Sequence, residues 1–98
     1  MTLPVSIREE AITEIRTIQL YLEGEKHGLG ERFLVELLAC LELIGRYPRA
    51  YQVRHHIYRY GQLADLQYHV IYAIEEGTVV VYRVRHMHRR TLKQFFGG

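Results

Sequence analysis

The residues best suited to chemistry lie in the last long segment of the chain, which begins with valines and ends in a cluster of bases. No Asp or Glu occurs between Gly77 and Gly98 to neutralise this cluster. Arginine and lysine neutralise phosphate groups, so the segment predicts contact with a nucleic acid or an acidic protein surface. The alternative is a basic surface that is merely solvated. The residues expected to bind a target are Arg83, Arg85, His88, Arg89, Arg90 and Lys93.

One enzymatic use of such side chains is the cleavage of RNA without a metal ion. His86 would act as general acid or base, and Arg83 or Arg59 would hold the charged phosphate in the transition state. Tyrosines of the preceding strands could stack on bases, although tyrosines in strands are more often core residues. These tyrosines are Tyr58, Tyr60 and Tyr68.

The six histidines raise the question of a metal site, which the spacing does not favour. His55 and His56 are adjacent, so in a strand they point to opposite faces. His86 and His88 share a face, but no carboxylate is close to them in sequence. Zinc sites usually show paired ligand spacings that are absent here, so neither a metal ion nor a cofactor is expected.

Composition places the chain among small globular proteins. Its 98 residues predict one domain, residues 1–98. The single cysteine, Cys40, excludes an internal disulfide and fits a reducing cytoplasm; on an apolar helix face it is expected to be a buried thiol. No signal peptide or membrane span is expected. Residues 1–47 carry five Lys/Arg and eight Asp/Glu (net −3), and residues 48–98 carry eight and three (net +5), so a basic face is expected.

Two helices are predicted between the first strand, at residues 3–7, and the later strands. The first has one apolar stripe at helical spacing and ends near Gly24: Ala11, Ile15, Ile18 and Leu22. The second runs from about Gly30 to Tyr47, where Pro48 stops it, with a core stripe of Phe33, Leu37, Cys40, Leu41 and Ile44. Further apolar residues of the second helix exceed what one buried face needs, which predicts a second buried face against the first helix, another chain or both. The residues expected to bind a protein partner or a second copy of the chain are Tyr21, Leu34 and Leu38.

Three strands are predicted after the helices, at residues 53–60, 66–74 and from Thr78 onward, with a turn at residues 61–65 and a tight connection at residues 75–77. Alternation along the last strand predicts Val79, Val81, Arg83 and Arg85 on one face and Val80, Tyr82, Val84 and His86 on the other. The tail at residues 91–96 could form one helical turn. The order β-α-α-β-β-β predicts an α+β fold, with a helical hairpin packed on one face of an antiparallel sheet.

The ordered set of these features resembles the ParE/RelE superfamily, the small toxins of bacterial type II toxin–antitoxin and plasmid stabilisation systems. The resemblance covers nearly the whole chain. It is carried by residues 5–7 leading into the first helical stripe with Tyr21 and Leu22, then by Arg32 and Phe33, Leu37 and Leu38, Leu43 and Ile44, Tyr47 and Pro48, residues 68–72, residues 81–86, and Arg89.

The resemblance implies a protein antitoxin as partner and one of two activities. ParE-like members inhibit DNA gyrase and are not nucleases, whereas RelE-like members cut messenger RNA on the ribosome. No tyrosine follows Tyr82, so the C-terminal tyrosine of several nucleases has no counterpart, and the ParE-like branch is favoured. The first alternative is an RNase using Arg59, Arg83 and His86. The second is a non-toxic relative that keeps only antitoxin binding.

Overall fold

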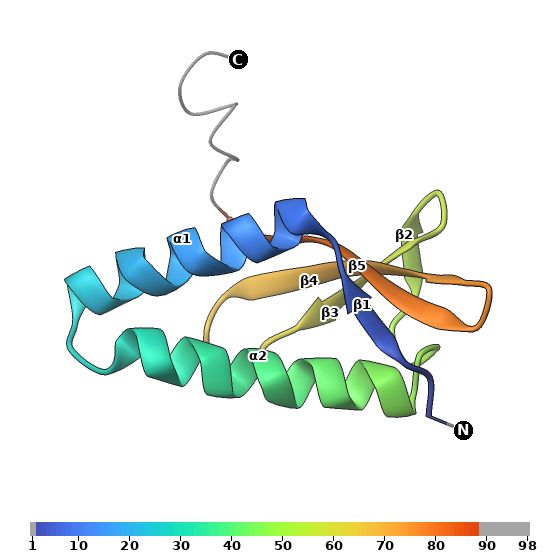
Figure 1. Cartoon of the computed structure of the whole chain (residues 1–98), viewed down its shortest axis with the longest axis horizontal. Helices are drawn as coiled ribbons and strands as arrows, with labels where there is room; N and C mark the ends of the chain where they lie inside the picture. Colours follow the sequence, from blue (N-terminus) through green and yellow to red (C-terminus); the bar gives the residue numbers. More distant parts are fainter. Residues whose placement is uncertain (1, 89–98) are drawn as a thin grey trace, which may run out of the picture.

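The computed structural model describes residues 2–88 and shows a pair of helices beside a twisted sheet (Figure 1). The elements in chain order are β1 (Val5–Ile7), α1 (Glu9–Glu25), α2 (Leu29–Arg46), β2 (Val53–His55), β3 (Tyr58–Gln62), β4 (Tyr68–Glu75) and β5 (Thr78–His86). The predicted α+β class and the helical hairpin against a sheet are confirmed. The predicted helical turn at residues 91–96 lies outside the described residues.

The sheet is mixed rather than wholly antiparallel. Its strand order is β1-β5-β4-β3-β2, and β2 to β5 pair antiparallel, as predicted. β1 instead lies parallel to β5, with Val5 opposite Val79 and Ile7 opposite Val81. No tight turn fixes the direction of this pair, because both helices and three strands separate β1 from β5 in the chain.

The predicted strand at residues 53–60 is in fact two strands. β2 ends at His55, and His56 has a φ of 52°, a left-handed conformation that reverses the chain before β3 begins at Tyr58. β3 then continues to Gln62, so the predicted turn at residues 61–65 starts later than expected. The consequence is a short hairpin that forms the sheet edge opposite β1.

A bulge in β5 overturns the predicted alternation of its side chains. Tyr72 lies opposite Val81 and Ile71 lies opposite Arg83, so Tyr82 is an extra residue that has no partner in the register. The faces therefore exchange after Tyr82. Val84 is buried together with Val81 and Val79, while Arg83 and Arg85 lie on the face of Val80.

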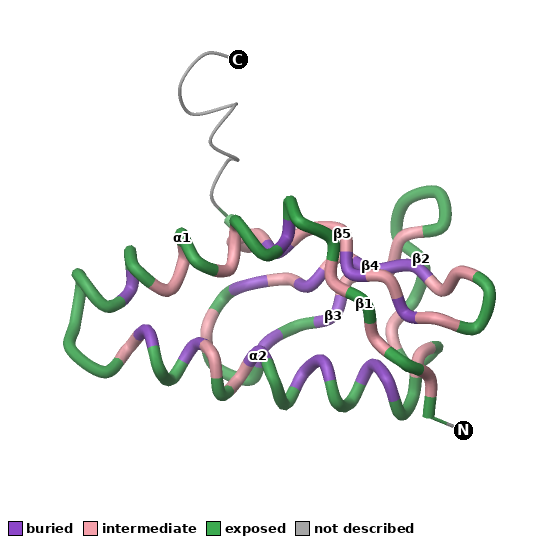
Figure 2. The backbone as a smooth tube through the Cα atoms, viewed as in Figure 1, coloured by how far each residue is buried: buried purple, intermediate pink, exposed green. Residues whose placement is uncertain are grey.

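The predicted apolar stripes of both helices form the core. In α1, Ala11 and Leu22 are buried and Ile15 and Ile18 pack against the core cluster. All five predicted core residues of α2 are buried, and Figure 2 shows short buried and exposed segments alternating within the turns of that helix. The sheet contributes the buried side chains Val70, Tyr72, Val79, Val81 and Val84. This core fixes which sheet face meets the helices and leaves the other face open.

Close approaches at two glycines hold the helices to each other and to the sheet. A Cβ on Gly30 would lie 2.8 Å from the carbonyl oxygen of Gln19, so α1 and α2 can be this close only with glycine there. A Cβ on Gly61 would lie 2.9 Å from the Cδ1 of Ile44, which places α2 directly over β3. The face of β3 that bears Gly61 is therefore the covered face.

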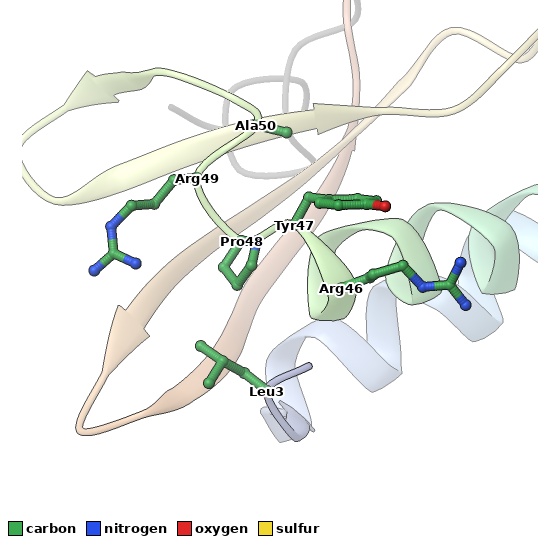
Figure 3. A pocket seen from close by; sticks show the side chains of 6 residues that line it. All are labelled: Leu3, Arg46, Tyr47, Pro48, Arg49 and Ala50. Carbon is green, nitrogen blue, oxygen red and sulfur yellow. The ribbon is translucent and has the colours of Figure 1, made fainter. Parts of the chain in front are cut away.

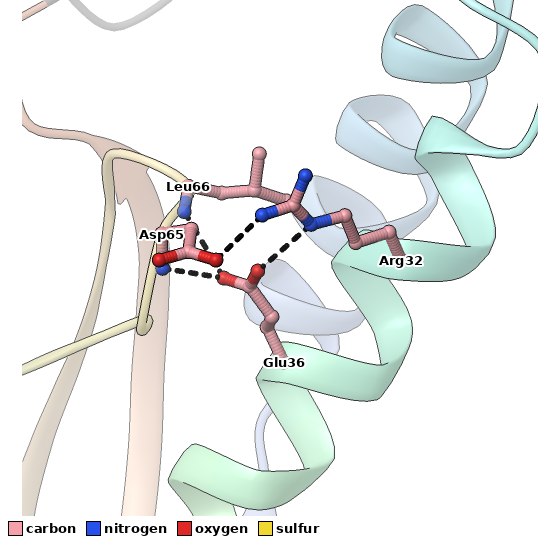
Figure 4. Close-up of polar contacts among 4 residues, drawn as sticks. All are labelled: Arg32, Glu36, Asp65 and Leu66. Atoms are coloured by element: carbon pink, nitrogen blue, oxygen red, sulfur yellow. Dashed lines mark hydrogen bonds and ion pairs between the residues drawn. The ribbon is translucent and has the colours of Figure 1, made fainter.

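A carboxylate of α2 anchors the loop between β3 and β4. Glu36 Oε1 accepts hydrogen bonds of 3.0 Å from the backbone N–H groups of Asp65 and Leu66 (Figure 4). Arg32 bridges the same groups, because its Nε donates to Glu36 and its Nη2 donates to Asp65 at 2.6 Å. Burial opposes ionisation of Glu36, but these donors outweigh it and hold the pKa of Glu36 below its ordinary value.

Candidate functional site

The arginines of β5 meet a carboxylate that comes from α1. Arg83 donates from Nε and Nη2 to Glu14 Oε2, at 3.0 and 2.7 Å. The other oxygen of Glu14 accepts the backbone N–H of Val84 at 2.9 Å, on the edge of β5 beyond the end of β1. Hydrogen bonding to Glu14 raises the pKa of Arg83. Arg83 is therefore neutralised within the molecule and ties the sheet to α1.

The residues of the predicted RNase set do not share one site. Arg59 lies opposite Tyr72 on the helix-covered face, and its Nη1 donates to the carbonyl oxygen of Tyr51. Arg83 lies on the opposite face, in the row of Tyr60 and Ile71.

His86 is also remote from Arg59, although both are on the helix-covered face. His86 pairs with Tyr68, which stands four residues from Tyr72 along β4, so the two rows are about 13 Å apart. The two side chains therefore start from well-separated rows of the sheet. The geometry supports no catalytic centre built from Arg59, Arg83 and His86 together.

The open face of the sheet carries a different cluster, which we call the cationic face: Arg54, Tyr60, Gln62, His69 and Arg85. The guanidinium carbon of Arg54 lies 5.1 Å from the centre of the Tyr60 ring. The Tyr60 and His69 rings meet edge to face at 5.4 Å, and His69 lies opposite both Gln62 and Arg85. Four strands, β2 to β5, thus bring cationic and aromatic groups to one surface.

Positive charge accumulates on the cationic face. Burial lowers the pKa of His69, and the charges of Arg54 and His88 lower it further. Among residues 2–88, neither Arg54 nor His69 forms an ion pair with a carboxylate. Arg85 is 3.8 Å from Glu14, and its Nε is buried without a hydrogen bond in this part of the chain. Arg54 therefore gives this surface a positive charge that an anion can still approach, whereas Arg85 is compensated in part by Glu14.

A second aromatic pair lies at the other end of the open face and is differently compensated. The Tyr58 and Tyr82 rings meet at 5.2 Å, and Arg8 lies 5.1 Å above the Tyr82 ring. The Tyr82 hydroxyl donates to Glu75, which raises the pKa of Tyr82. This end therefore contains its own carboxylate, whereas Arg54 on the cationic face has none within ion-pair distance among residues 2–88.

The apolar helix residues that were predicted to contact a partner are exposed only in part. Leu38 is 64% exposed and Tyr21 is 42% exposed, as a contact surface requires, whereas Leu34 packs against the core. Val35 and Leu20 are also strongly exposed, at 61% and 74%. Val35 and Leu38 are three residues apart and share one side of α2, so they can contact the same partner.

A shallow apolar hollow of about 580 Å³ lies where α2 ends (Figure 3). Its lining is Leu3, Arg46, Tyr47, Pro48, Arg49 and Ala50. The guanidinium groups of Arg46 and Arg49 point away from each other in Figure 3, and Arg46 pairs with Glu42. The hollow could take an apolar side chain, but it does not bring together an acid and a base.

The remaining predicted residues fall at the end of β5 or in the core. His88 is exposed, and its backbone N–H donates to Nδ1 of His86. Arg89, Arg90 and Lys93 lie outside the described residues. Cys40 is buried, and burial raises its pKa to about 11, so it is a thiol rather than a thiolate at neutral pH.

Residues 2–88 contain neither a candidate membrane span nor a candidate metal cluster. No helix in that range is long and apolar enough to cross a bilayer. The same residues bring no three His, Cys, Asp or Glu side chains together as metal ligands. Sequence reasoning missed three residues of the candidate site, Glu14, Arg54 and His69. The partner of Glu14 is 69 residues away, and the contacts of Arg54 and His69 depend on how neighbouring strands align.

The fold is shared with toxins of solved toxin–antitoxin complexes. The chromosomal ParDE system of P. aeruginosa has a TM-score of 0.75 at 8% identity, covering 89% of this chain and 98% of that one. RelBE2 of Mycobacterium tuberculosis has a TM-score of 0.61 at 20% identity, covering 88% and 99%. The intact RelBE complex of E. coli has a TM-score of 0.59 at 18% identity, covering 89% and 99%.

The sequence itself matches the family described as ParE toxin of type II toxin–antitoxin system, parDE, over residues 5–91. The chain belongs to this family and is a toxin component of the type II class. No curated protein sequence matches it significantly. The structural relatives have low identity and establish the fold alone, so they do not decide between gyrase and the ribosome as target.

Proposed function

We propose that this toxin inhibits DNA gyrase and is neutralised by a cognate antitoxin. The single observation that carries the proposal is the match to the ParE toxin family over residues 5–91. The separation of Arg59, Arg83 and His86 adds support, because an RNase built on these residues would need them around one phosphate.

Gyrase would be contacted through the basic end of the chain. Arg85 and His88 contribute from the described part, and Arg89, Arg90 and Lys93 would extend the same charge. Arg83 contributes less than its sequence position suggests, because Glu14 already binds it. The antitoxin would cover the exposed apolar residues of α2, with Leu38 at the centre of the contact.

Two assays on the purified full chain test the proposal. In a supercoiling assay, the protein should inhibit gyrase or trap cleaved DNA, and addition of the antitoxin should restore activity. In a coupled translation assay, it should leave messenger RNA intact. Cleavage of messenger RNA without any effect on gyrase would instead establish the RelE-like activity. No effect in either assay, and no growth arrest on expression, would indicate a relative that retains only antitoxin binding.

A further inference from the structure

The open sheet face offers flat rings beside Arg54, whose charge has no ion-pair partner among residues 2–88. Tyr60 and His69 are both half-buried, so part of each ring remains accessible. Their edge-to-face contact at 5.4 Å and the Arg54 guanidinium over Tyr60 fix the orientation of the group. Held in this way, the rings lose little conformational freedom when a planar ligand packs on them.

The charges around these rings are placed for an extended anion rather than a single ion. Arg54 comes from β2, and Arg85 from β5, with β3 and β4 between them in the sheet. Neighbouring strands are about 4.8 Å apart, so three strand spacings separate these positions by roughly 14 Å. Successive phosphates of a nucleotide chain can occupy such a span, whereas one phosphate or carboxylate cannot reach both ends.

Arg83, Arg54 and Arg85 differ in how closely a carboxylate already pairs with them. Arg83 has a carboxylate at 2.7 Å, while Arg54 has none within ion-pair distance among residues 2–88. Arg85 is paired with the same Glu14, but only at 3.8 Å and without a hydrogen bond at its Nε in this part of the chain, so the pair is looser than that of Arg83. Gln62 adds an exposed amide next to His69 that can donate to a base or a phosphate.

We propose that the cationic face binds single-stranded nucleic acid, with a base packed on Tyr60 and His69 and flanking phosphates held by Arg54 and Arg85. The inference extends the proposed function by making nucleic acid a direct contact of the toxin. It rests on the proposed function in one respect, because that function determines which nucleic acid the protein meets in a cell. Binding to oligonucleotides without gyrase therefore tests it independently.

The experiment measures fluorescence anisotropy of labelled oligothymidylate and oligouridylate, each of about twelve nucleotides, with the full chain at about 50 mM and about 200 mM salt. Arg54→Gln should weaken binding about 5-fold and flatten the salt dependence. Arg16→Gln is the matched control, since it removes the same charge from an exposed position on α1. Tyr60→Leu should weaken binding about 5-fold or more, and Tyr60→Phe should restore it because the ring is retained.

Preference for either oligonucleotide supports the proposal and identifies DNA or RNA as the ligand. Equal losses in Arg54→Gln and Arg16→Gln would overturn it, because binding would then reflect net charge alone. Equal affinity for a polyglutamate peptide would also overturn it and indicate an acidic protein. Failure to bind either oligonucleotide would exclude the inference and leave gyrase inhibition untouched, since gyrase is absent from this assay.

Discussion

Arg83 and Arg54 lie on the same open face of the sheet, but only Arg83 is paired with a carboxylate among residues 2–88. Arg83 and the neighbouring backbone N–H of Val84 share the carboxylate of Glu14, so this end of the face is closed by its own counterion. Arg54 has an aromatic ring beneath it and no carboxylate in the described part of the chain. A basic residue keeps its charge available to a partner only where the rest of the fold leaves that charge uncompensated.

The largest effect should come from removing the counterion. Glu14→Gln leaves the Arg83 guanidinium without its charged partner and weakens the bond to Val84, so we expect a loss of about 2 kcal/mol in unfolding free energy. Urea unfolding at neutral pH measures this loss. Glu9→Gln, in the exposed first turn of α1, is the control and should change stability by less than about 0.5 kcal/mol. Equal changes in the two variants would mean that Glu14 does not tie α1 to the sheet.

Glu14→Gln should also make Arg83 resemble Arg54, because both arginines would then lack a carboxylate partner in the described part of the chain. Glu14→Gln releases Arg83 and also removes the weaker ion pair of Arg85, so the affinity of this variant for single-stranded nucleic acid should rise rather than fall. Affinity that falls in parallel with stability would instead show that Glu14 supports the shape of the face.

A second prediction separates the apolar surface of α2 from the sheet face. Leu38 is exposed, so Leu38→Asp should leave the stability of the isolated toxin unchanged. Antitoxin affinity, measured by calorimetry, should fall about 30-fold, as expected when an interface anchor worth about 2 kcal/mol is lost. Thr17→Asp, on an exposed position of α1, provides a matched control for the added charge. Unfolding of Leu38→Asp would show that Leu38 is part of the core.

A third prediction uses pH to test the loop that leads into the cationic face. Glu36 holds the loop before β4, and its pKa is lowered in the folded state, so its contribution is present above the unfolded value of about 4.3 and is lost as pH falls through the folded value. Glu36→Gln should therefore cost roughly 1 kcal/mol at pH 7, and the cost should vanish in acid. Chemical unfolding of both proteins from pH 7 to pH 3 measures this difference. If the loss of unfolding free energy is the same at every pH, it comes from packing rather than from the charge of Glu36.

The helices could be predicted from the sequence because their signals are local. The spacing of Phe33, Leu37 and Ile44 defines one face of α2, and Pro48 follows its end directly. The reversal at His56 and the bulge at Tyr82 could not be predicted in this way. Neither contains the glycine that usually marks such a turn or bulge, and both depend on how neighbouring strands align.

The candidate site was less predictable because its contacts join distant segments. Glu14 and Arg83 are 69 residues apart, and in the sequence Glu14 is simply a polar residue on the exposed side of a helix. His69 alternates with the core residues Tyr68 and Val70, which does place it on the open face. Its contacts with Tyr60 and Arg85 follow only from the register of three strands.

The smallest expected effect compares the two arginines directly. Arg83→Gln should reduce affinity for single-stranded nucleic acid less than about 2-fold, because Glu14 already neutralises the charge that is removed, whereas Arg54→Gln should reduce it about 5-fold. Stability should show the reverse order, since Arg83→Gln breaks the tie to α1 and Arg54 is exposed. Anisotropy and urea unfolding on the same two proteins measure both quantities. If Arg83→Gln causes the greater loss of affinity, then nucleic acid displaces Glu14, and the two ends of the face form one binding surface.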